Sequence, residues 1–408
     1  MEVREPSAKY LARPGYKQTE VGAVPEDWKV SKLGGHATFK TGPFGSALHQ
    51  SDYVDGGVPV INPMQIIDGR IQPTPSMAIT EQAARKLSEF RLSAGNIIIG
   101  RRGDMGRCAF VRTEEHGWLC GTGSMIIRTG PTLDACFIQR VLSSPPIIAE
   151  IENASVGSTM INLNQGTLGN LLVPLPPTKA EQEAIAEALS DADALIESLE
   201  QLLAKKRHIK QGAMQELLTG KKRLPGFSGK WQVKRLGELF DVFAGGDFDP
   251  SRSSTVRDER HPFPVYSNAV TDSGLYGFCA YSAYPASTIT VTARGTLGVA
   301  NFRNHPYTAI GRVLVLQPKL ELDGRFLSAL INNRITFVIE STGVPQLTAP
   351  QISKYVVPTP TCAEQTAIAA ILSDMDAEII ALDAKLAKAR NLKQGMMQEL
   401  LTGRIRLI

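Results

Sequence analysis

The chain has 408 residues, 43% of them hydrophobic, and its 44 Lys and Arg against 40 Asp and Glu give a formal net charge of +4. This length suggests two or three domains, and the modest positive charge permits nucleic-acid binding without demonstrating it. We expect no secretory signal and no spanning helix, because no apolar run is long enough. Five widely spaced cysteines without a Cys-x-x-Cys pair indicate a reduced, cytoplasmic protein with no disulfide framework.

Residues 1–20 are polar and are expected to form an N-terminal arm. A first domain is predicted over residues 21–173 and opens with an apolar pattern around Trp28. Further on, a strand-like run enters the glycine loop Arg102-Gly-Asp-Met-Gly, and a second apolar run follows, which predicts a hairpin. A short helix is predicted at 133–142. The short strands and turns predict a mixed α/β domain.

A long helix is predicted within a helical region spanning residues 174–224. Proline-rich sequence precedes Thr178, which with Glu181 fits a capping box, and Gly220 fits a left-handed helix end. About 40 residues lie between these signals, which corresponds to about 60 Å of helix.

The chain then repeats this arrangement. A second domain, over residues 225–357, opens around Trp231 and contains Arg294-Gly-Thr-Leu-Gly between two strand-like runs. A second helical region, 358–408, aligns with the first without a gap at an offset of 183, and roughly two-thirds of the positions are identical. The sequence therefore predicts an α+β protein with a pseudo-two-fold repeat, in the order domain, helix, domain, helix.

Apolar residues in both helices recur in alternating steps of four and three, which is the seam of a coiled coil. A lone helix with such a seam would leave it in water, and the economical partner is the other copy. The alternative is two unrelated amphipathic helices, each packed on its own domain. The predicted interface consists of Ile185, Leu189, Ile196, Leu199, Leu203, Ile368, Leu372, Ile379, Leu382 and Leu386.

Two features of the helices have no explanation in the sequence alone. Gly212 and Gly395 lie inside the helices, where each costs about 1 kcal/mol relative to alanine, and a kink or the close approach of a partner chain are the alternatives. Basic clusters at 205–210 and 221–223 are either solvated or form a phosphate or subunit contact.

The search for catalytic motifs favours a binding protein. The chain has no phosphate-binding Gly-x-x-x-x-Gly-Lys-[Ser/Thr] loop, no Gly-x-Ser-x-Gly elbow and no Asn/Asp-Pro-Pro-aromatic loop of an amino-group methyltransferase. Cys108, His116 and Cys120 are one ligand short of a structural zinc site and lack paired spacing, so no metal site is predicted.

Polar loops that carry Arg, Lys and Gly are the candidates for DNA contact. Arginine reads guanine, Asn and Gln read adenine, and glycine lets the backbone approach phosphate closely. For any one loop the alternative is a plain turn with a solvated arginine, but the repeated Arg-Gly-x-x-Gly favours Arg102 and Arg294. The predicted DNA-binding residues are Lys40, Thr41, Gly42, Ser46, Arg101, Arg102, Gly103, Arg107, Ser158, Ser267, Asn268, Thr292, Arg294, Gly295 and Gln346.

As a set, these features resemble the specificity subunit of type I restriction–modification systems. The resemblance covers nearly the whole chain after the arm. It is carried by the Glu-Gln-x-Ala-Ile-Ala segments at 181–186 and 364–369, by the Lys-Gln-Gly-x-Met-Gln-Glu-Leu-Leu-Thr-Gly endings at 210–220 and 393–403, and by the openings and proline-rich exits of the domains.

The resemblance implies two target-recognition domains separated by two long helices that form an antiparallel coiled coil. Each domain would read one half of a bipartite, asymmetric site on double-stranded DNA, and the helix pair would set the gap. The chain itself would be non-catalytic and hold no cofactor. It would dock two adenine-N6 methyltransferase subunits and, through the complex, motor-nuclease subunits, with S-adenosylmethionine, Mg and ATP expected on those partners. The alternative is a non-enzymatic coiled-coil scaffold whose domains bind proteins; an enzyme on the domain loops is a third possibility.

Overall fold

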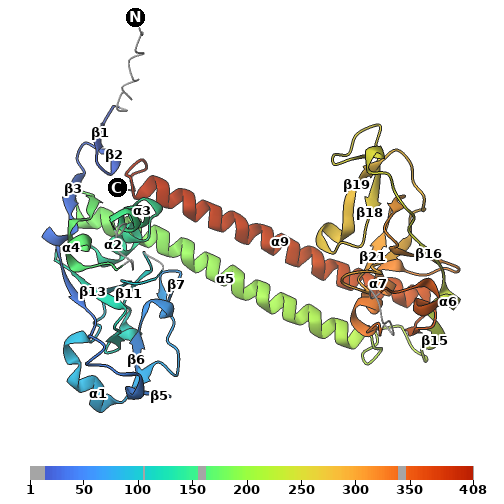
Figure 1. Ribbon diagram of the computed structural model, residues 1–408, viewed down its shortest axis with the longest axis horizontal. Coiled ribbons are helices and arrows are strands. Elements are labelled where there is room, and N and C mark those ends of the chain that lie inside the picture. Colours follow the sequence, from blue (N-terminus) through green and yellow to red (C-terminus); the bar gives the residue numbers. More distant parts are fainter. Residues whose placement is uncertain (1–13, 104–105, 155–161, 339–345, 408) are drawn as a thin grey trace, which may run out of the picture. The chain divides into compact units, whose positions relative to one another are not determined.

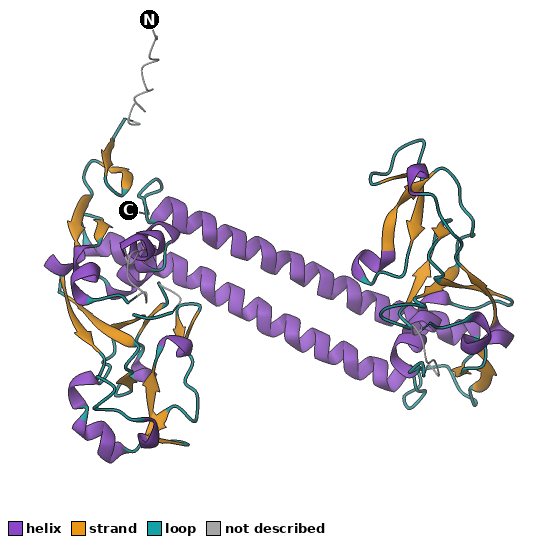
Figure 2. Cartoon of the chain, viewed as in Figure 1, coloured by secondary structure: helices purple, strands orange, loops and turns teal. Residues whose placement is uncertain are grey.

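The computed structural model describes residues 14–103, 106–154, 162–338 and 346–407. The chain divides into two compact units, the first made of Met1–Ser198 with Leu386–Ile408 and the second of Leu199–Lys385. Both divisions fall inside long helices, so each unit contains one domain and a part of each long helix. Figure 1 labels the elements, and Figure 2 distinguishes helices from strands.

The strands of the first unit are β1 (Tyr16–Thr19), β2 (Gly22–Pro25), β3 (Lys29–Lys32), β4 (Ala37–Thr41), β5 (Tyr53–Val54), β6 (Val58–Ile61), β7 (Ile66–Ile67), β8 (Arg70–Ile71), β9 (Ala78–Ile79), β10 (Ile97–Gly100), β11 (Cys108–Phe110), β12 (Leu119–Cys120), β13 (Ser124–Thr129) and β14 (Leu172–Leu175). Its short helices are α1 (Glu81–Lys86), α2 (Ala135–Leu142), α3 (Pro145–Ala154) and α4 (Gln165–Asn170).

The strands of the second unit are β15 (Gln232–Arg235), β16 (Phe240–Ala244), β17 (Ser253–Ser254), β18 (Phe263–Tyr266), β19 (Leu275–Cys279), β20 (Thr288–Val291), β21 (Ala300–Arg303), β22 (Thr308–Ala309), β23 (Leu314–Pro318) and β24 (Val356–Thr359). Its short helices are α6 (Leu236–Leu239), α7 (Gly324–Arg334) and α8 (Ala349–Ile352). The long helices α5 (Lys179–Leu217) and α9 (Cys362–Leu400) contribute to both units.

The two domains share one sheet topology. One sheet has the strand order β11-β10-β13-β4 in the first domain and β21-β20-β23-β16 in the second. The other sheet has the order β12-β6-β9-β5 and β22-β18-β19-β17, with the parallel pair β6–β12 matched by β18–β22. The prediction of a repeated, mixed α/β domain is therefore confirmed, although the loops between matching strands differ.

The central strands β10 and β20 are buried along their whole length, as their unbroken runs of apolar and β-branched residues predict. Each forms the predicted hairpin with the next strand, as the antiparallel pairs Ile98–Ala109 and Thr290–Asn301 show. Helix α2 forms where a short helix is predicted at 133–142, and α7 is its counterpart in the second domain. Asp134 and Asp323 cap these helices by accepting hydrogen bonds from backbone N–H groups.

Each domain is closed by a pairing between its last strand and the strand that directly follows its opening tryptophan. The opening strands β3 and β15 pair antiparallel with the proline-containing exit strands β14 and β24. The predicted openings and exits of the domains thus meet in space. Residues 16–19, which belong to the predicted arm, instead form β1 and pair with β2, and the phenol of Tyr16 donates to the carbonyl oxygen of Gly403 at 3.1 Å.

The ends of the long helices follow the sequence signals. Thr178 and Thr361 accept hydrogen bonds from the backbone N–H groups of Glu181 and Glu364, at 3.2 and 3.4 Å. Gly220 and Gly403 have left-handed φ angles of 68° and 69°. A Cβ on either glycine would also press against a tryptophan ring, that of Trp231 in the second unit and Trp28 in the first. The same two residue types therefore close both helices.

Within each unit, the start of one long helix and the end of the other share a single hydrophobic core. In the first unit Ile185 and Leu189 of α5 lie in the same core as Leu400 of α9, and in the second unit Leu218 lies in the same core as Ile368. All ten residues of the predicted seam are buried or partly buried. The helices continue without interruption through Gly212 and Gly395, where an added methyl group would meet open space.

Acidic residues of α9 neutralise much of the basic cluster at 205–210. In the second unit Lys206 pairs with Glu378 at 2.5 Å, Arg207 pairs with Asp383 at 2.9 Å, and Lys210 pairs with Asp376. Three of the basic side chains in this cluster therefore have carboxylate partners on α9, a use that the sequence did not predict. A residue spacing alone does not reveal which charges the partner helix places opposite it.

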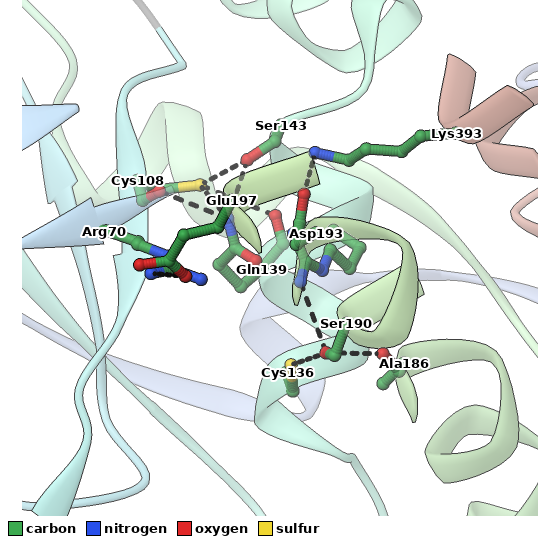
Figure 3. A network of polar contacts seen from close by, with 11 residues as sticks. Arg70, Cys108, Cys136, Gln139, Ser143, Ala186, Ser190, Asp193, Glu197 and Lys393 are labelled. Atoms are coloured by element: carbon green, nitrogen blue, oxygen red, sulfur yellow. Dashed lines mark hydrogen bonds and ion pairs between the residues drawn. The ribbon is translucent and has the colours of Figure 1, made fainter. Parts of the chain in front are cut away.

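The first domain is tied to both long helices by ion pairs (Figure 3). Asp193 of α5 binds Arg140 of α2 at 2.6 Å and Lys393 of α9 at 2.5 Å. Arg70 of β8 binds Glu197 of α5 at 2.5 Å. Because the Arg140 and Asp193 side chains are mostly buried, they orient the domain more firmly than surface pairs would.

Candidate nucleic-acid interface

In the first domain, the Arg-Gly loop leaves the end of β10 and is held on two sides. The backbone N–H of Arg101 donates to the carbonyl oxygen of Gly123, and its carbonyl oxygen accepts from Leu163, both at 2.9 Å. The Arg101 guanidinium donates to the Asn162 side chain at 3.1 Å. Burial and the neighbouring charge of Arg102 lower the pKa of Arg101. Arg102 itself is exposed, and Gly103 has a φ of 80°.

The second domain holds its Arg-Gly loop in the same way. The backbone N–H of Leu347 donates to the carbonyl oxygen of Ala293 at 2.9 Å, which matches the bond between Leu163 and Arg101. Arg294 then donates twice to the side-chain oxygen of Gln346, at 3.1 and 2.8 Å. The loop thus holds an arginine and a glutamine side by side, two side chains whose hydrogen-bonding groups can read bases.

Buried polar contacts close this loop from within. The hydroxyl of Thr292 donates to the carbonyl oxygen of Thr296 at 2.5 Å and accepts from the backbone N–H of Val299 at 2.9 Å. Thr292 is buried, so the structure gives it a role in shaping the loop. Gly295, with a φ of 69°, lies at the exposed tip.

In the second domain, an asparagine joins the loop that follows β18 to the Arg-Gly loop. Asn268 follows β18 and accepts from the backbone N–H of Ala293 at 2.7 Å while it donates to the carbonyl oxygen of Gly311 at 2.5 Å. Asn62 follows β6 in the first domain and accepts from the N–H of Gly123 at 3.0 Å. Sequence reasoning missed Asn62; an asparagine within two residues of the end of a strand-like run in both domains was the available signal.

The predicted segment 40–46 reaches the same part of the first domain. Lys40 is paired with Glu89 at 2.5 Å, and the hydroxyl of Thr41 accepts from Gln165 at 3.0 Å. Gly42 donates its N–H to Ser124, and a Cβ at this position would overlap the carbonyl oxygen of Gly121. The exposed part of the segment is its tip, which includes Ser46.

The remaining predicted residues are placed as follows. Arg107 lies just before β11, where its carbonyl oxygen accepts from Gly100 at 2.7 Å. Ser267 directly follows β18, and its N–H donates to the carbonyl oxygen of Gly274 at 2.8 Å. Ser158 lies outside the described residues. The structure therefore brings Arg101, Thr41 and Gly42 near the loop around Gly123, and gathers Asn268, Arg294 and Gln346 in the second domain.

Within the described ranges, no group of three or more His, Cys, Asp and Glu residues is placed to hold a metal ion. Cys108 and Cys120 are buried, and burial raises the pKa of both thiols, that of Cys108 to about 11. A membrane-crossing helix is also not found in the part of the chain that the structure describes.

The two repeats are each recognised by one family model. The model of the type I restriction modification DNA specificity domain matches residues 25–205 and 228–389. The chain belongs to this family of specificity subunits. It recognises DNA as a member of a larger complex and is itself non-catalytic, because the catalytic activities of such complexes lie on other subunits.

Relatives and solved structures agree with this family along the whole chain. A putative type I restriction enzyme MjaX specificity subunit of Methanocaldococcus jannaschii is 25% identical over 426 residues, which cover 98% of each chain. The crystal structure of the S subunit of a type I restriction–modification system from M. genitalium has a TM-score of 0.61 at 20% identity, over 91% of this chain and 96% of that one. A further chain, from a study of the assembly and conformational transition of a type I system, has a TM-score of 0.53 at 19% identity, over 94% and 99%. These structural likenesses support the fold.

Proposed function

We propose that each domain reads one half of a bipartite, asymmetric DNA target through its Arg-Gly loop. The observation that carries this proposal is the matched clamping of the two loops, by Leu163 on Arg101 and by Leu347 on Ala293. The framework is the same, but the residues that it presents differ. Two domains that share one loop framework but present different contact residues suit a DNA target whose two halves have different sequences.

The chemistry of the loops fits reading in the major groove. A guanidinium donates to two acceptors of guanine, and an Asn or Gln side chain makes paired bonds to adenine. Arg294 donates to Gln346 at 2.8 Å, and this bond orients both side chains. On binding, the bond between them would be shared with or exchanged for bonds to base edges.

The long helices would act as an antiparallel coiled coil that sets the gap between the half-sites. Each contains 39 residues, which corresponds to about 58 Å of helix. Successive turns of the major groove are about 34 Å apart, so rods of this length suit a reader of two separated half-sites. The buried seam and the ion pairs between α5 and α9 in the second unit support this role.

Docking of two methyltransferase subunits is supported by a patch that occurs twice. Ile209 is 44% exposed and lies three residues before Gly212, and Leu392 is 58% exposed and lies three residues before Gly395. An exposed apolar side chain beside a bare backbone is a surface on which another helix packs closely. The bound subunits would use S-adenosylmethionine to methylate adenine N6, and motor-nuclease subunits with Mg and ATP would join through the complex.

The proposal is tested by mapping methylated adenines across the genomes of cells with and without this gene. We expect a two-part motif that depends on the gene. Exchange of residues 21–173 for the first domain of a relative should then replace one half of the motif and leave the other half and the gap intact. A change in both halves would contradict separate reading by the two domains.

A further inference from the structure

A turn in the second domain has an unfavourable backbone conformation that nothing in its sequence requires. The segment η7 (Thr271–Gly274) contains two successive non-glycine residues with left-handed φ angles, 48° at Asp272 and 53° at Ser273. Gly274 follows with a φ of 85°. Residues other than glycine rarely adopt a left-handed φ, because it crowds Cβ against the backbone. Such strain persists only where the surrounding structure imposes it.

A buried arginine binds this turn through a backbone carbonyl oxygen. Arg303 of β21 is 5% exposed and donates to the carbonyl oxygen of Ser273 at 2.6 Å and to the hydroxyl of Thr290 at 2.9 Å. Its guanidinium also lies 3.5 Å from the ring centre of Tyr266. Among the described residues no carboxylate pairs with it. Burial of a guanidinium without a carboxylate partner is costly. Arg303 is unusual because a neutral carbonyl oxygen, that of Ser273, is one of the acceptors that satisfy its buried charge.

The strained turn borders the candidate interface. It belongs to the loop 267–274, whose Asn268 binds the N–H of Ala293, the residue before Arg294. The loop is closed at its base by the bond from Ser267 to Gly274. At the turn, Asp272 is exposed, and no described residue bonds its carboxylate. The segment that supports Arg294 through Asn268 therefore also presents an exposed carboxylate, that of Asp272, on a backbone closed at its base.

We propose that this loop is a specificity element of the second domain, in which Asp272 accepts a hydrogen bond from the amino group of cytosine and Arg303 positions it. The inference rests on the proposed function of the domain as a DNA reader. A carboxylate is repelled by phosphates and adds nothing to general affinity, so its value lies in rejecting bases that offer it no donor. A held turn favours this rejection, because it fixes the backbone position from which the Asp272 side chain reaches a base.

The corresponding segment of the first domain is built differently. After β6 the chain forms a short 3-10 helix, η3 (Pro63–Gln65), and the hairpin β7–β8, with Asp68 at a φ of 49° in its turn. This difference limits the inference to the second half-site and supplies a matched control.

The first experiment maps methylated adenines in cells whose complex contains the full chain with Asp272→Asn. Asparagine tolerates left-handed φ and is the same size, so it changes the chemistry alone. We expect discrimination at one base pair of the second domain's half-site to fall about tenfold or more, with the other half-site unchanged. Asp68→Asn should leave the motif intact. An unchanged motif with Asp272→Asn would overturn the reading role of this residue.

The second experiment tests the positioning role of Arg303. Arg303→Met should make the second half-site degenerate, and addition of Ser273→Gly should restore it, because glycine adopts left-handed φ without the arginine. Failure of the rescue while the first half-site is still read would show that Arg303 only supports the core. If Arg303→Met abolishes methylation of both halves and Ser273→Gly does not restore it, the positioning role is likewise rejected. If the wild-type complex yields no two-part motif, the proposed function fails first, and the two failures are thereby distinguished.

Discussion

Arg406, near the C-terminus, binds the nearly buried carboxylate of Glu181 at the start of α5, 225 positions earlier in the chain, at 2.8 Å. Arg223 binds Glu364 at 2.8 Å in the second unit, so the same pair closes both repeats. Each arginine also lies over the tryptophan that opens its domain, Trp28 or Trp231. The first repeat is therefore completed by the last residues of the chain.

Removal of either arginine should destabilise its own unit. Arg406→Met leaves Glu181 buried without its charge partner, and we expect a loss of about 2–3 kcal/mol of unfolding free energy. Hydrogen exchange of the full chain should show the loss in the first unit, whereas Arg223→Met should show it in the second. Glu181→Gln added to Arg406→Met should recover part of the stability. Uniform loss across both units would contradict separate closure of the repeats.

A second prediction concerns the seam between the long helices. Leu203 is buried and its neighbour Leu202 is 39% exposed, so the two leucines provide a matched pair on one helix turn. Leu203→Ala should cost about 2–5 kcal/mol by creating a cavity, and Leu202→Ala less than about 0.5 kcal/mol. Chemical unfolding of the full chain measures both. Equal costs would mean that the seam does not face a partner helix.

Local signals in the sequence predicted the parts of the fold that depend on near neighbours. The caps at Thr178 and Thr361, the glycine helix ends and the two hairpins all formed where their residue spacing indicated. Long-range pairings were missed. The carboxylate of Glu181 was predicted to serve its own helix cap, but it binds Arg406, because spacing along a helix does not reveal what the rest of the chain brings against it.

In the candidate site, too, local sequence signals identified some residues and missed those that depend on long-range contacts. Arg102 and Arg294 were recognised from a repeated local motif, and both lie at the predicted loops. Thr292 was predicted as a polar residue beside the same motif, yet it is buried and bonded within its loop. Arg303 was not singled out at all, since its partners Ser273 and Thr290 are 30 and 13 residues away. Exposure and long-range bonding decide between a contact residue and a supporting one, and neither can be read from a motif.

The glycines inside the long helices supply a third prediction. Gly212→Ala and Gly395→Ala should each stabilise the free chain by about 1 kcal/mol, because a methyl group there meets open space and alanine favours the helix. If partner subunits pack on these positions, the same changes should weaken their binding, which co-purification or calorimetry with the methyltransferase subunit measures. Gln211→Ala, a change at the exposed residue before Gly212, is the matched control. If the two variants stabilise the free chain but leave the affinity for the partner subunit unchanged, the docking surface lies elsewhere.

The last prediction separates the two half-sites. Arg102→Ala and Arg294→Ala should each cost about 1–3 kcal/mol of specific DNA binding and relax the motif in one half only, since each arginine belongs to a different domain. Arg85→Ala, an exposed arginine on α1 outside the loops, removes the same charge and should lower affinity slightly for all sequences. Binding of the full complex to duplexes that differ in one half-site measures the effect. Wild-type discrimination by both variants would remove these arginines from the reading surface, whereas relaxation of both halves by one variant would mean that the domains do not read independently.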